Sequence, residues 1–397
     1  MSVVVTNARN RIAYNVVRSL GQRGVPVYVA DSVSRPMSAA SRYASGHFTY
    51  PSPFHDPEGF IECLATELPR LGADVLIPVF EETFLIARHK ARLSPLVSMA
   101  VPDYDQILTA HNKDKWELVA RRLGIPVPAA YSTEALRAGG VSASQLRFPV
   151  LIKPKQGGGA WGIREAPSRA ALEQLLDQPT WDGKSWDRFF VQEKVEGETH
   201  CVAMLFNRGQ LRAKVAYRQL RDFPTTGGQA TVRVSLRSET AERYLQQLLE
   251  DLRWHGPCQA DFIVDRQTGL PYLIDVNPRL WGSLVQAIAS GVDFPYLIYR
   301  LAKDGDVPPV ASFKTGVVTR WLGGDIAALP ARLRSSSEKL TVLRDFLFPA
   351  TPAVLFDDFS WSDPLPMVHW CADAIVRAVK FRSMAAVSHD SLQGTWE

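Results

Sequence analysis

Cysteine is scarce in this sequence of 397 residues, with only Cys63, Cys201, Cys258 and Cys371, all far apart. No Cys-x-x-Cys pair occurs, which excludes a disulfide framework or a cysteine-rich zinc site and fits a reducing cytoplasm. Apolar runs of the roughly 18 residues that a membrane span needs are also absent. The first eleven residues hold one short valine run followed by polar residues, which is not the pattern of a secretory signal. We therefore expect a cytoplasmic protein.

The sequence also has little excess of positive over negative charge. Lys and Arg total 45 against 41 for Asp and Glu, a net charge of +4. This excess is too small and too evenly spread to predict binding to nucleic acid. A composition of 46% hydrophobic and 22% charged residues is typical of a folded globular chain. The length alone predicts two to three domains.

The N-terminal part has the pattern of an α/β unit. Residues 2–6, 25–30 and 74–79 are predicted to be buried strands, and residues 12–20 have the apolar spacing of a helix. Strands separated by helices predict a parallel sheet with right-handed crossovers. A dinucleotide site would require glycines after the first strand, yet that turn is Asn-Ala-Arg-Asn-Arg and the first glycine is Gly21. We therefore expect a structural or substrate-shaping domain.

A lysine followed by glycines is the first motif that suggests phosphate chemistry. The apolar strand 148–152 leads into Lys153, and four glycines follow shortly after, at Gly157, Gly158, Gly159 and Gly162. Glycines let backbone N–H groups converge on phosphate oxygens, and a lysine supplies a point charge for the same anion. The Gly-Lys-Ser/Thr ending of a Walker A loop is missing. A plain β-hairpin with a lysine on its stem remains an equal alternative.

The segment that contains Glu193, Lys194 and Val195 ends a strand and is followed by Glu198. Backbone groups in such a segment can meet the edge of a purine, and a carboxylate a few residues later can accept hydrogen bonds from ribose hydroxyls. Taken alone, the segment is better explained as an acidic surface turn.

Residues 256–277 predict a hairpin whose acids share one face. The turn lies near residue 268, so Asp261 and Asp275 should be cross-strand neighbours. Asp275 and Asn277 are two residues apart and therefore point to the same side of their strand. Three oxygen ligands on one face predict a Mg²⁺ site, with the guanidinium of Arg279 beside it. The alternative is a surface hairpin with incidental acids.

The order of these motifs between about residues 111 and 301 resembles the ATP-grasp superfamily. The stretch Asn-Pro-Arg-Leu-Trp-Gly-Ser at 277–283 is most similar to its carbamoyl-phosphate-synthase-like branch of carboxylate–amine ligases. The resemblance implies α/β and α+β folds in three parts. These are a pre-ATP-grasp parallel-sheet domain (1–108), a two-lobed ATP-grasp domain (109–305, with a nucleotide lid at about 125–200 and a metal-binding core at about 201–305), and a C-terminal helical region (306–397).

The resemblance also implies a role for each matched residue. Phosphate binding falls to Lys115, with Lys113 close by, to Lys153, and to the glycine loop. Glu193, Lys194 and Val195 match the adenine hinge, and Glu198 matches the ribose acid. The metal ligands are Asp261, Asp275 and Asn277, and Arg279 stabilises the transferred phosphoryl group. Arg218, Arg221 and Arg233 are candidates for binding a substrate carboxylate, with Arg218 and Arg233 taken as catalytic.

The expected function is an ATP-dependent ligase that activates a carboxylate as an acyl phosphate for attack by an amine. Its cofactors would be ATP and one or two Mg²⁺ ions, with Mn²⁺ as a substitute, and its partners a small carboxylate, an amine and a second copy in a homodimer. A bicarbonate-using enzyme of the carboxylase or carbamoyl-phosphate type, and a nucleotide-binding protein without turnover, are the alternatives. The apolar spacing of residues 367–381 predicts a helix packed on the body rather than lying on a membrane.

Overall fold

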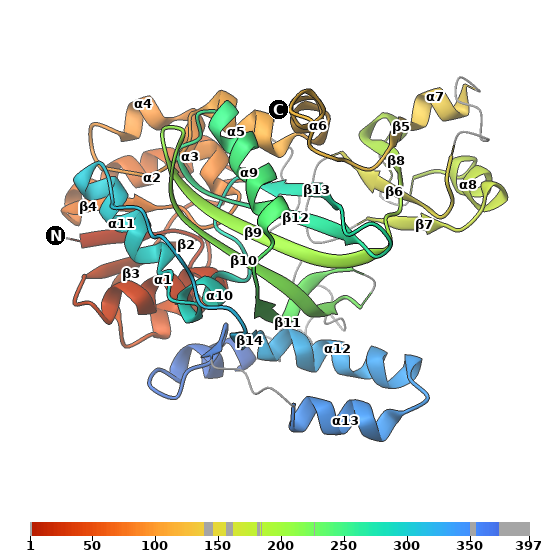
Figure 1. The fold of residues 1–397 in the computed structure, drawn as a ribbon. Coiled ribbons are helices and arrows are strands. Elements are labelled where there is room, and N and C mark those ends of the chain that lie inside the picture. Colours follow the sequence, from red (N-terminus) through yellow and green to blue (C-terminus); the bar gives the residue numbers. More distant parts are fainter. Residues whose placement is uncertain are drawn as a thin grey trace.

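A computed structural model describes residues 2–138, 146–155, 162–180, 183, 185–225, 227–349 and 355–372. They form three sheets with helices packed around them (Figure 1). In these residues no helix is both long enough and apolar enough to cross a membrane.

The N-terminal unit is a parallel sheet in the order β3-β2-β1-β4. The three predicted strands are confirmed, whereas β3 was not predicted because its six residues alternate in burial without a strongly apolar face. The predicted first helix is also confirmed, and the Asn10 side chain accepts a hydrogen bond from the Ile12 N–H at its start. The elements are β1 (Ser2–Val5), α1 (Arg11–Gly21), β2 (Val27–Asp31), η1 (Met37–Ala40), β3 (Ala44–Thr49), α2 (Pro57–Arg70), β4 (Ala73–Ile77), α3 (Glu82–Arg88), α4 (Lys90–Leu93) and α5 (Tyr104–His111).

A small lobe follows, built on an antiparallel sheet in the order β5-β8-β6-β7. Its buried apolar side chains form a cluster of their own around Val150, Ile152 and Val191. The lobe therefore has a core separate from the rest of the chain. Its elements are β5 (Ala130–Ser132), α7 (Thr133–Arg137), β6 (Val150–Pro154), β7 (Arg164–Ala166), α8 (Arg169–Leu176), η3 (Trp186–Arg188) and β8 (Phe189–Glu193).

The largest sheet has the order β13-β12-β9-β10-β11-β14-β15. Its last two strands come from the C-terminal region, so the prediction that this region is helical was incomplete. These strands have only two or three residues and are too short to show a periodic pattern, so the sequence did not predict them. The elements are α6 (Lys113–Arg122), β9 (Gly197–Asn207), β10 (Gln210–Phe223), β11 (Gln229–Ser235), α9 (Glu239–Asp251), β12 (Gly256–Asp265), β13 (Pro271–Asn277), α10 (Leu284–Ala289), α11 (Phe294–Asp304), β14 (Val318–Arg320), α12 (Leu322–Ser335), α13 (Lys339–Leu347) and β15 (Leu355–Phe356).

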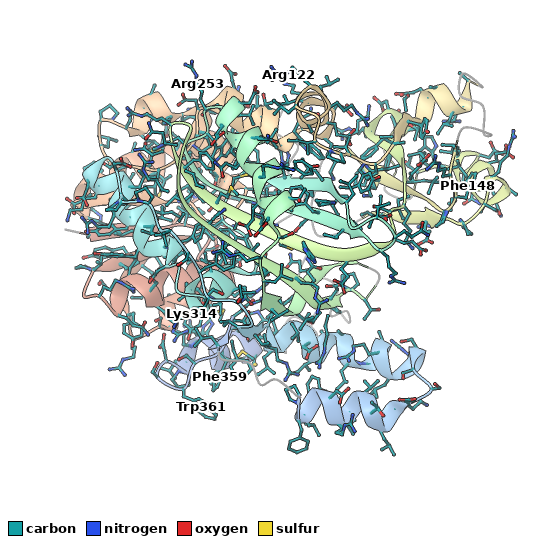
Figure 2. All side chains as sticks on the ribbon, in the orientation of Figure 1. Arg122, Phe148, Arg253, Lys314, Phe359 and Trp361 are labelled. Carbon is teal, nitrogen blue, oxygen red and sulfur yellow. The ribbon has the colours of Figure 1, made fainter. Side chains whose placement is uncertain are left out.

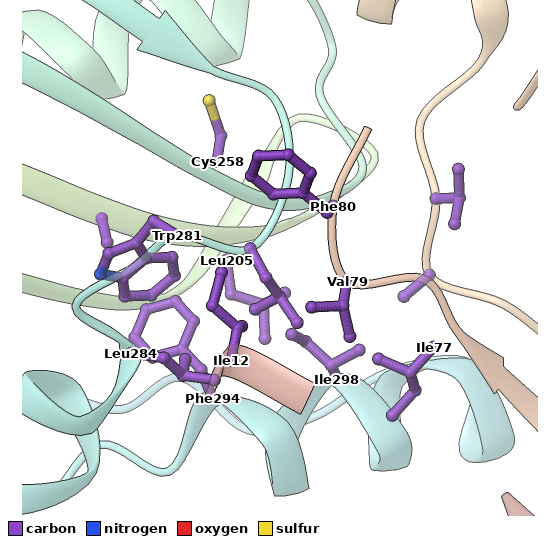
Figure 3. Close-up of a cluster of buried hydrophobic side chains, with 14 of the residues drawn as sticks. Ile12, Ile77, Val79, Phe80, Leu205, Cys258, Trp281, Leu284, Phe294 and Ile298 are labelled. Carbon is purple, nitrogen blue, oxygen red and sulfur yellow. The ribbon is translucent and has the colours of Figure 1, made fainter. Parts of the chain in front are cut away.

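One continuous core joins the N-terminal unit to the large sheet. Ile12 and Val79 from the N-terminal unit pack with Leu205, Trp281 and Phe294 (Figure 3). All five side chains are 2% exposed or less. The domain boundary predicted at residue 108 therefore does not coincide with a break in the core packing. It falls inside helix α5.

The C-terminal segment returns to the N-terminal unit. Asn15 and Arg18 of α1 donate hydrogen bonds to the Asp357 carbonyl oxygen and to Ser360, at 2.7 Å and 2.9 Å. The hydroxyl of Ser41 donates to Asp363 at 2.5 Å. Polar contacts thus fix residues 357–363 against the start of the chain.

Candidate active site

The hairpin of β12 and β13 brings the predicted metal ligands together. Asp261 and Asp275 are direct cross-strand partners, and Asn277 pairs with Gln259 in the same ladder. The predicted register is therefore confirmed. The Asn277 amide donates to Gln259 Oε1 at 2.9 Å and to Asp275 Oδ2 at 3.3 Å, which leaves its oxygen for another partner. Two carboxylates and one amide oxygen are hard ligands of the kind that Mg²⁺ prefers.

The electrostatics of the hairpin favour a bound cation. Burial, and then the charge of Asp275, raise the pKa of Asp261 to about 6. Gln259 donates to Asp261 Oδ1 at 2.6 Å, which only partly offsets this cost. No group of three His, Cys, Asp or Glu side chains suited to a metal occurs in the described part of the chain, so a site here needs the Asn277 amide. The donor set fits a divalent ion.

Lys113, rather than Lys115, faces these acids. The Nζ atom of Lys113 lies 3.7 Å from Asp275 Oδ1, and its side chain is 12% exposed. Lys115 points to solvent. Asn112 caps helix α6, and this start sets which lysine turns inward. The structure therefore does not bring Lys115 into the cluster and puts Lys113 in its place.

Lys153 enters the same region from the small lobe. It ends the buried part of β6, and its Nζ donates to the buried Gln192 Oε1 at 2.8 Å. Burial and the charge of Lys113 lower the pKa of Lys153 to about 8, while Asp275 and Glu117 oppose the change. Burial, Arg279 and Lys113 likewise lower the pKa of His111 to about 4. Burial is the main cause of both shifts, and the neighbouring cations Lys113 and Arg279 add to them, so an anion such as a phosphate bound here would favour the charged form of Lys153.

Arg279 connects the hairpin to the N-terminal unit. Its guanidinium lies 4.2 Å from the ring centroid of Phe80, in the loop after β4. The neighbouring Glu81 is 6% exposed, and burial raises its pKa to about 7 although Arg279 lowers it. Neither loop residue belongs to a motif that the sequence pattern identified. Their position at the carboxyl end of a parallel strand, where α/β sheets bind ligands, was the available signal.

The predicted nucleotide segment lies on β8 and just after it. The backbone N–H groups of Glu193 and Lys194 already donate to Ala129 and Pro149, so a purine edge bound here would use other backbone groups. Lys194 Nζ pairs with Glu165 at 2.7 Å. Val195 is half-buried. Gly162 has a φ of 71°, whereas Gly157, Gly158 and Gly159 lie outside the described residues.

Glu198 and Arg218 were assigned separate roles, and the structure pairs them. Arg218 Nη1 donates to Glu198 Oε1 at 2.7 Å across neighbouring strands. This bond, ahead of the other charges, lowers the pKa of Glu198. If Glu198 bound a ribose and Arg218 bound a substrate carboxylate, the ion pair between these two side chains would first have to break.

Arg233, predicted to be catalytic, is bonded to groups other than the predicted metal ligands. It is fully buried, and its guanidinium donates to Thr319, to the Ala230 carbonyl and to Asp357. Arg221 is also committed, since it donates to Asp325 at 2.9 Å. The alternation of apolar and polar residues could not separate buried ion pairs from substrate arginines.

Comparisons with known proteins agree with this geometry. Residues 110–283 match the family model of the ATP-grasp domain. Urea amidolyase of Lachancea kluyveri is 22% identical over 210 residues, 49% of this chain and 11% of that protein. D-alanine–D-alanine ligase of Clostridium acetobutylicum is 27% identical over 181 residues, 40% of this chain and 50% of that protein. The chain thus spans half or less of these relatives' own length.

Solved structures of low identity share the fold. Biotin carboxylase of Campylobacter jejuni, in a complex with an ATP analogue, has a TM-score of 0.65 at 17% identity, over 80% of this chain and 74% of that one. L-amino acid ligase of Bacillus licheniformis has a TM-score of 0.59 at 16% identity, over 78% of each chain. Residues 110–283 are therefore similar to the ATP-grasp domain, and the chain as a whole shares its fold with these structures.

Proposed function

We propose that this protein is an ADP-forming ligase that joins a carboxylate to an amine at the expense of ATP. The observation that carries the proposal is the convergence of Lys113 and Lys153 on the oxygen ligands of the β12–β13 hairpin. Charge neutralisation and positioning are what phosphoryl transfer requires of a protein. The similarity of residues 110–283 to the ATP-grasp domain supports the same chemistry.

The geometry suggests which residues would bind the metal ions and ATP. Asp261, Asp275 and Asn277 would hold one or two Mg²⁺ ions, with Mn²⁺ as a substitute. A bound divalent ion supplies charge neutralisation to the phosphate oxygens. Lys113 and Lys153 would bind those oxygens from two sides. The segment 193–195 and Glu198 would hold the adenosine, and the glycine loop at 157–162 would close over the phosphates.

The proposed reaction has two steps. A substrate carboxylate oxygen attacks the terminal phosphorus of ATP, so that the bond to ADP breaks and an acyl phosphate forms. The amine nitrogen then attacks the acyl carbon and loses a proton, and phosphate leaves as the C–N bond forms. Arg279, which senses the charges of Asp275 and Asp261, would stabilise the charge on the transferred group.

The loop after β4 is the part of the N-terminal unit that reaches Arg279. We place the carboxylate substrate between this loop and the hairpin. The four cysteines at 63, 201, 258 and 371 are free thiols, which suits a cytoplasmic enzyme. The homodimer stays a prediction that a sedimentation measurement would test.

The test is release of ADP and phosphate from Mg·ATP across amino acids and small carboxylic acids, singly and in pairs. Release that requires one acid and one amine, with a stoichiometric amide product, is the expected result. Bicarbonate-dependent release without an organic acid would move the protein to the carboxylase type. Tight ATP binding without release under any pair would favour a nucleotide-binding protein without turnover.

A further inference from the structure

A second concave region lies far from the metal hairpin. It is a cavity of about 690 Å³ between the β9–β10 turn, the start of α5 and the end of α9. Its ionisable lining residues are Lys90, Asp103, Arg208, Glu250, Arg253 and His255. Arg208 lies seven residues along the chain from Cys201, the partner of Asp261 in the sheet. At about 3.3 Å per strand residue, the cavity is roughly 20 Å from the metal ligands.

Two arginines are held side by side at this cavity. The N–H of Gly209 donates to the Trp254 carbonyl at 2.7 Å, which ties the β9–β10 turn to the segment after α9. A Cβ atom on Gly209 would lie 3.4 Å from Arg253 Cα, so the two backbones are in direct contact. Arg208 and Arg253 both have a positive φ, of 46° and 48°. The chain thus adopts an unfavourable backbone conformation at both arginines.

The charges at the cavity are not balanced. Lys90 and Asp103 neutralise each other at 2.7 Å, and Glu250 accepts a hydrogen bond from Gln246 at 2.8 Å. Arg208 and Arg253 are exposed, and neither guanidinium has a hydrogen-bond or ion-pair partner within the described residues. With Lys90, Arg208 and Arg253 against Asp103 and Glu250, the cavity lining carries a net charge of +1, and the two arginines hold its excess positive charge.

His255 also lines the cavity, and its imidazole is partly buried. Its Nδ1 atom is buried, and no hydrogen-bond partner for it occurs in the described portion of the chain. Burial, then Lys90 and Arg208, lower the pKa of this imidazole to about 4, while Asp103 opposes them. The imidazole is therefore neutral at pH 7, and an anion bound in the cavity beside it would favour its charged form.

We propose that this cavity is a second ligand site, which binds a small anion with carboxylate or phosphate oxygens between Arg208, Arg253 and the imidazole of His255. The volume is within the range of small-molecule sites. Guanidinium groups bind carboxylate and phosphate oxygens through paired, charge-assisted hydrogen bonds. Arg253 lies on the upper edge of the molecule in Figure 2, on the same edge as Arg122, which pairs with Asp251 and does not line the cavity.

The test is NMR titration of the histidine imidazoles in the full-length protein, with His255→Gln to assign the His255 signal. Sodium phosphate and sodium malonate are added separately, against sodium chloride of equal ionic strength. We expect phosphate or malonate, and not chloride, to raise the pKa of His255 from about 4 towards its ordinary 6.5. The anion that acts identifies whether phosphate or carboxylate oxygens are the ligand.

Two variants decide whether the cavity is responsible. Arg208→Ala with Arg253→Ala should weaken the anion's effect on His255 at least about tenfold, because two charged donors are lost. Arg122→Ala should leave it unchanged. The loss of Arg208 also raises the pKa of His255 before any anion is added. The quantity compared between variants is therefore the additional change in this pKa that the anion causes. The proposal is overturned if neither anion moves the His255 signal, or if the double variant responds as the wild type does.

Discussion

At the scale of single residues, the hairpin acids carry the sharpest prediction. Asp275→Asn should lower turnover by about 10³-fold or more while the protein stays folded, because the amide cannot supply a metal-binding charge. Asp265→Asn is the matched control, since Asp265 lies on the same hairpin and bonds only within its turn. Steady-state kinetics with circular dichroism would check both. Normal turnover by folded Asp275→Asn would remove the metal assignment.

The two lysines of helix α6 give a second prediction. Lys113→Ala should reduce kcat/KM for ATP by roughly 10²-fold, because it removes a charge next to Asp275. Lys115→Ala should change it less than about twofold, since its side chain faces solvent. The opposite order would show that the helix turns on binding and presents the other lysine.

Glu81 gives a pH-dependent prediction. Its folded pKa is about 7 against an ordinary 4.5, so the folded state holds a proton that the unfolded state has lost between these values. Its contribution to stability is therefore complete below pH 4.5 and is lost as the pH rises to about 7. Glu81→Gln should remove this loss, which leaves the variant more stable than the wild type at pH 8 by on the order of 3 kcal/mol. Urea unfolding at pH 5 to 8 would measure the difference, and parallel curves for the two proteins would contradict it.

Sequence patterns predicted residue types better than residue partners. The strand period placed Asp261 opposite Asp275, because alternation and a central turn leave one register. The choice between Lys113 and Lys115 depended on where Asn112 starts the helix, and a spacing pattern does not define this to one residue. The burial of Arg233 depended on Asp357, which lies 124 residues later in the chain.

At the scale of elements, α12 and α13 are attached to the large sheet mainly through charge. Arg221, Arg320 and Arg332 surround the buried carboxylate of Asp325 at 2.9, 2.6 and 3.7 Å. Arg221 and Arg320 also donate to backbone carbonyls of α13, which buries no side chain of its own. One carboxylate therefore links both helices to β10 and β14.

Asp325→Asn should destabilise this region by about 3–5 kcal/mol, since three guanidinium groups lose their shared counter-charge. Limited proteolysis between residues 322 and 347 should become faster. Asp345→Asn, whose side chain is 45% exposed, should change stability by less than about 1 kcal/mol. Equal protease resistance of both variants would show that apolar contacts hold the helices instead.

The hairpin that carries the predicted metal ligands could be predicted from sequence, and the short C-terminal strands could not. The hairpin of β12 and β13 has a turn signal and two alternating runs, so both strands were found. β15 has two residues and β14 has three, and their place in the sheet depends on pairing with distant strands. Tertiary contacts decide such segments, and no local pattern can show them.

At the scale of the whole molecule, the chain joins three sheets through two separate cores. The cluster around Val150, Ile152 and Val191 shares no residue with the one that unites the N-terminal unit and the large sheet. Lys153, which belongs to the small lobe, faces charges from the larger part. The proposed phosphate site therefore lies where the two cores meet.

Two cores imply two units of cooperative unfolding, each with its own melting behaviour. Hydrogen exchange should show the amides of β6 and β8 opening at a lower free energy than those of β9 and β12, because the lobe's cluster, with nine buried residues among those the structure describes, stabilises less than the larger core. Mg·ATP should slow exchange in β6 and β8 the most, since binding connects the less stable unit to the more stable one. A single exchange free energy throughout would mean that the lobe melts with the rest. If the small lobe and the larger part unfold separately, a bound nucleotide would make the unfolding of one depend on the other. Calorimetric heat-capacity traces with and without nucleotide would then differ in the number of unfolding transitions.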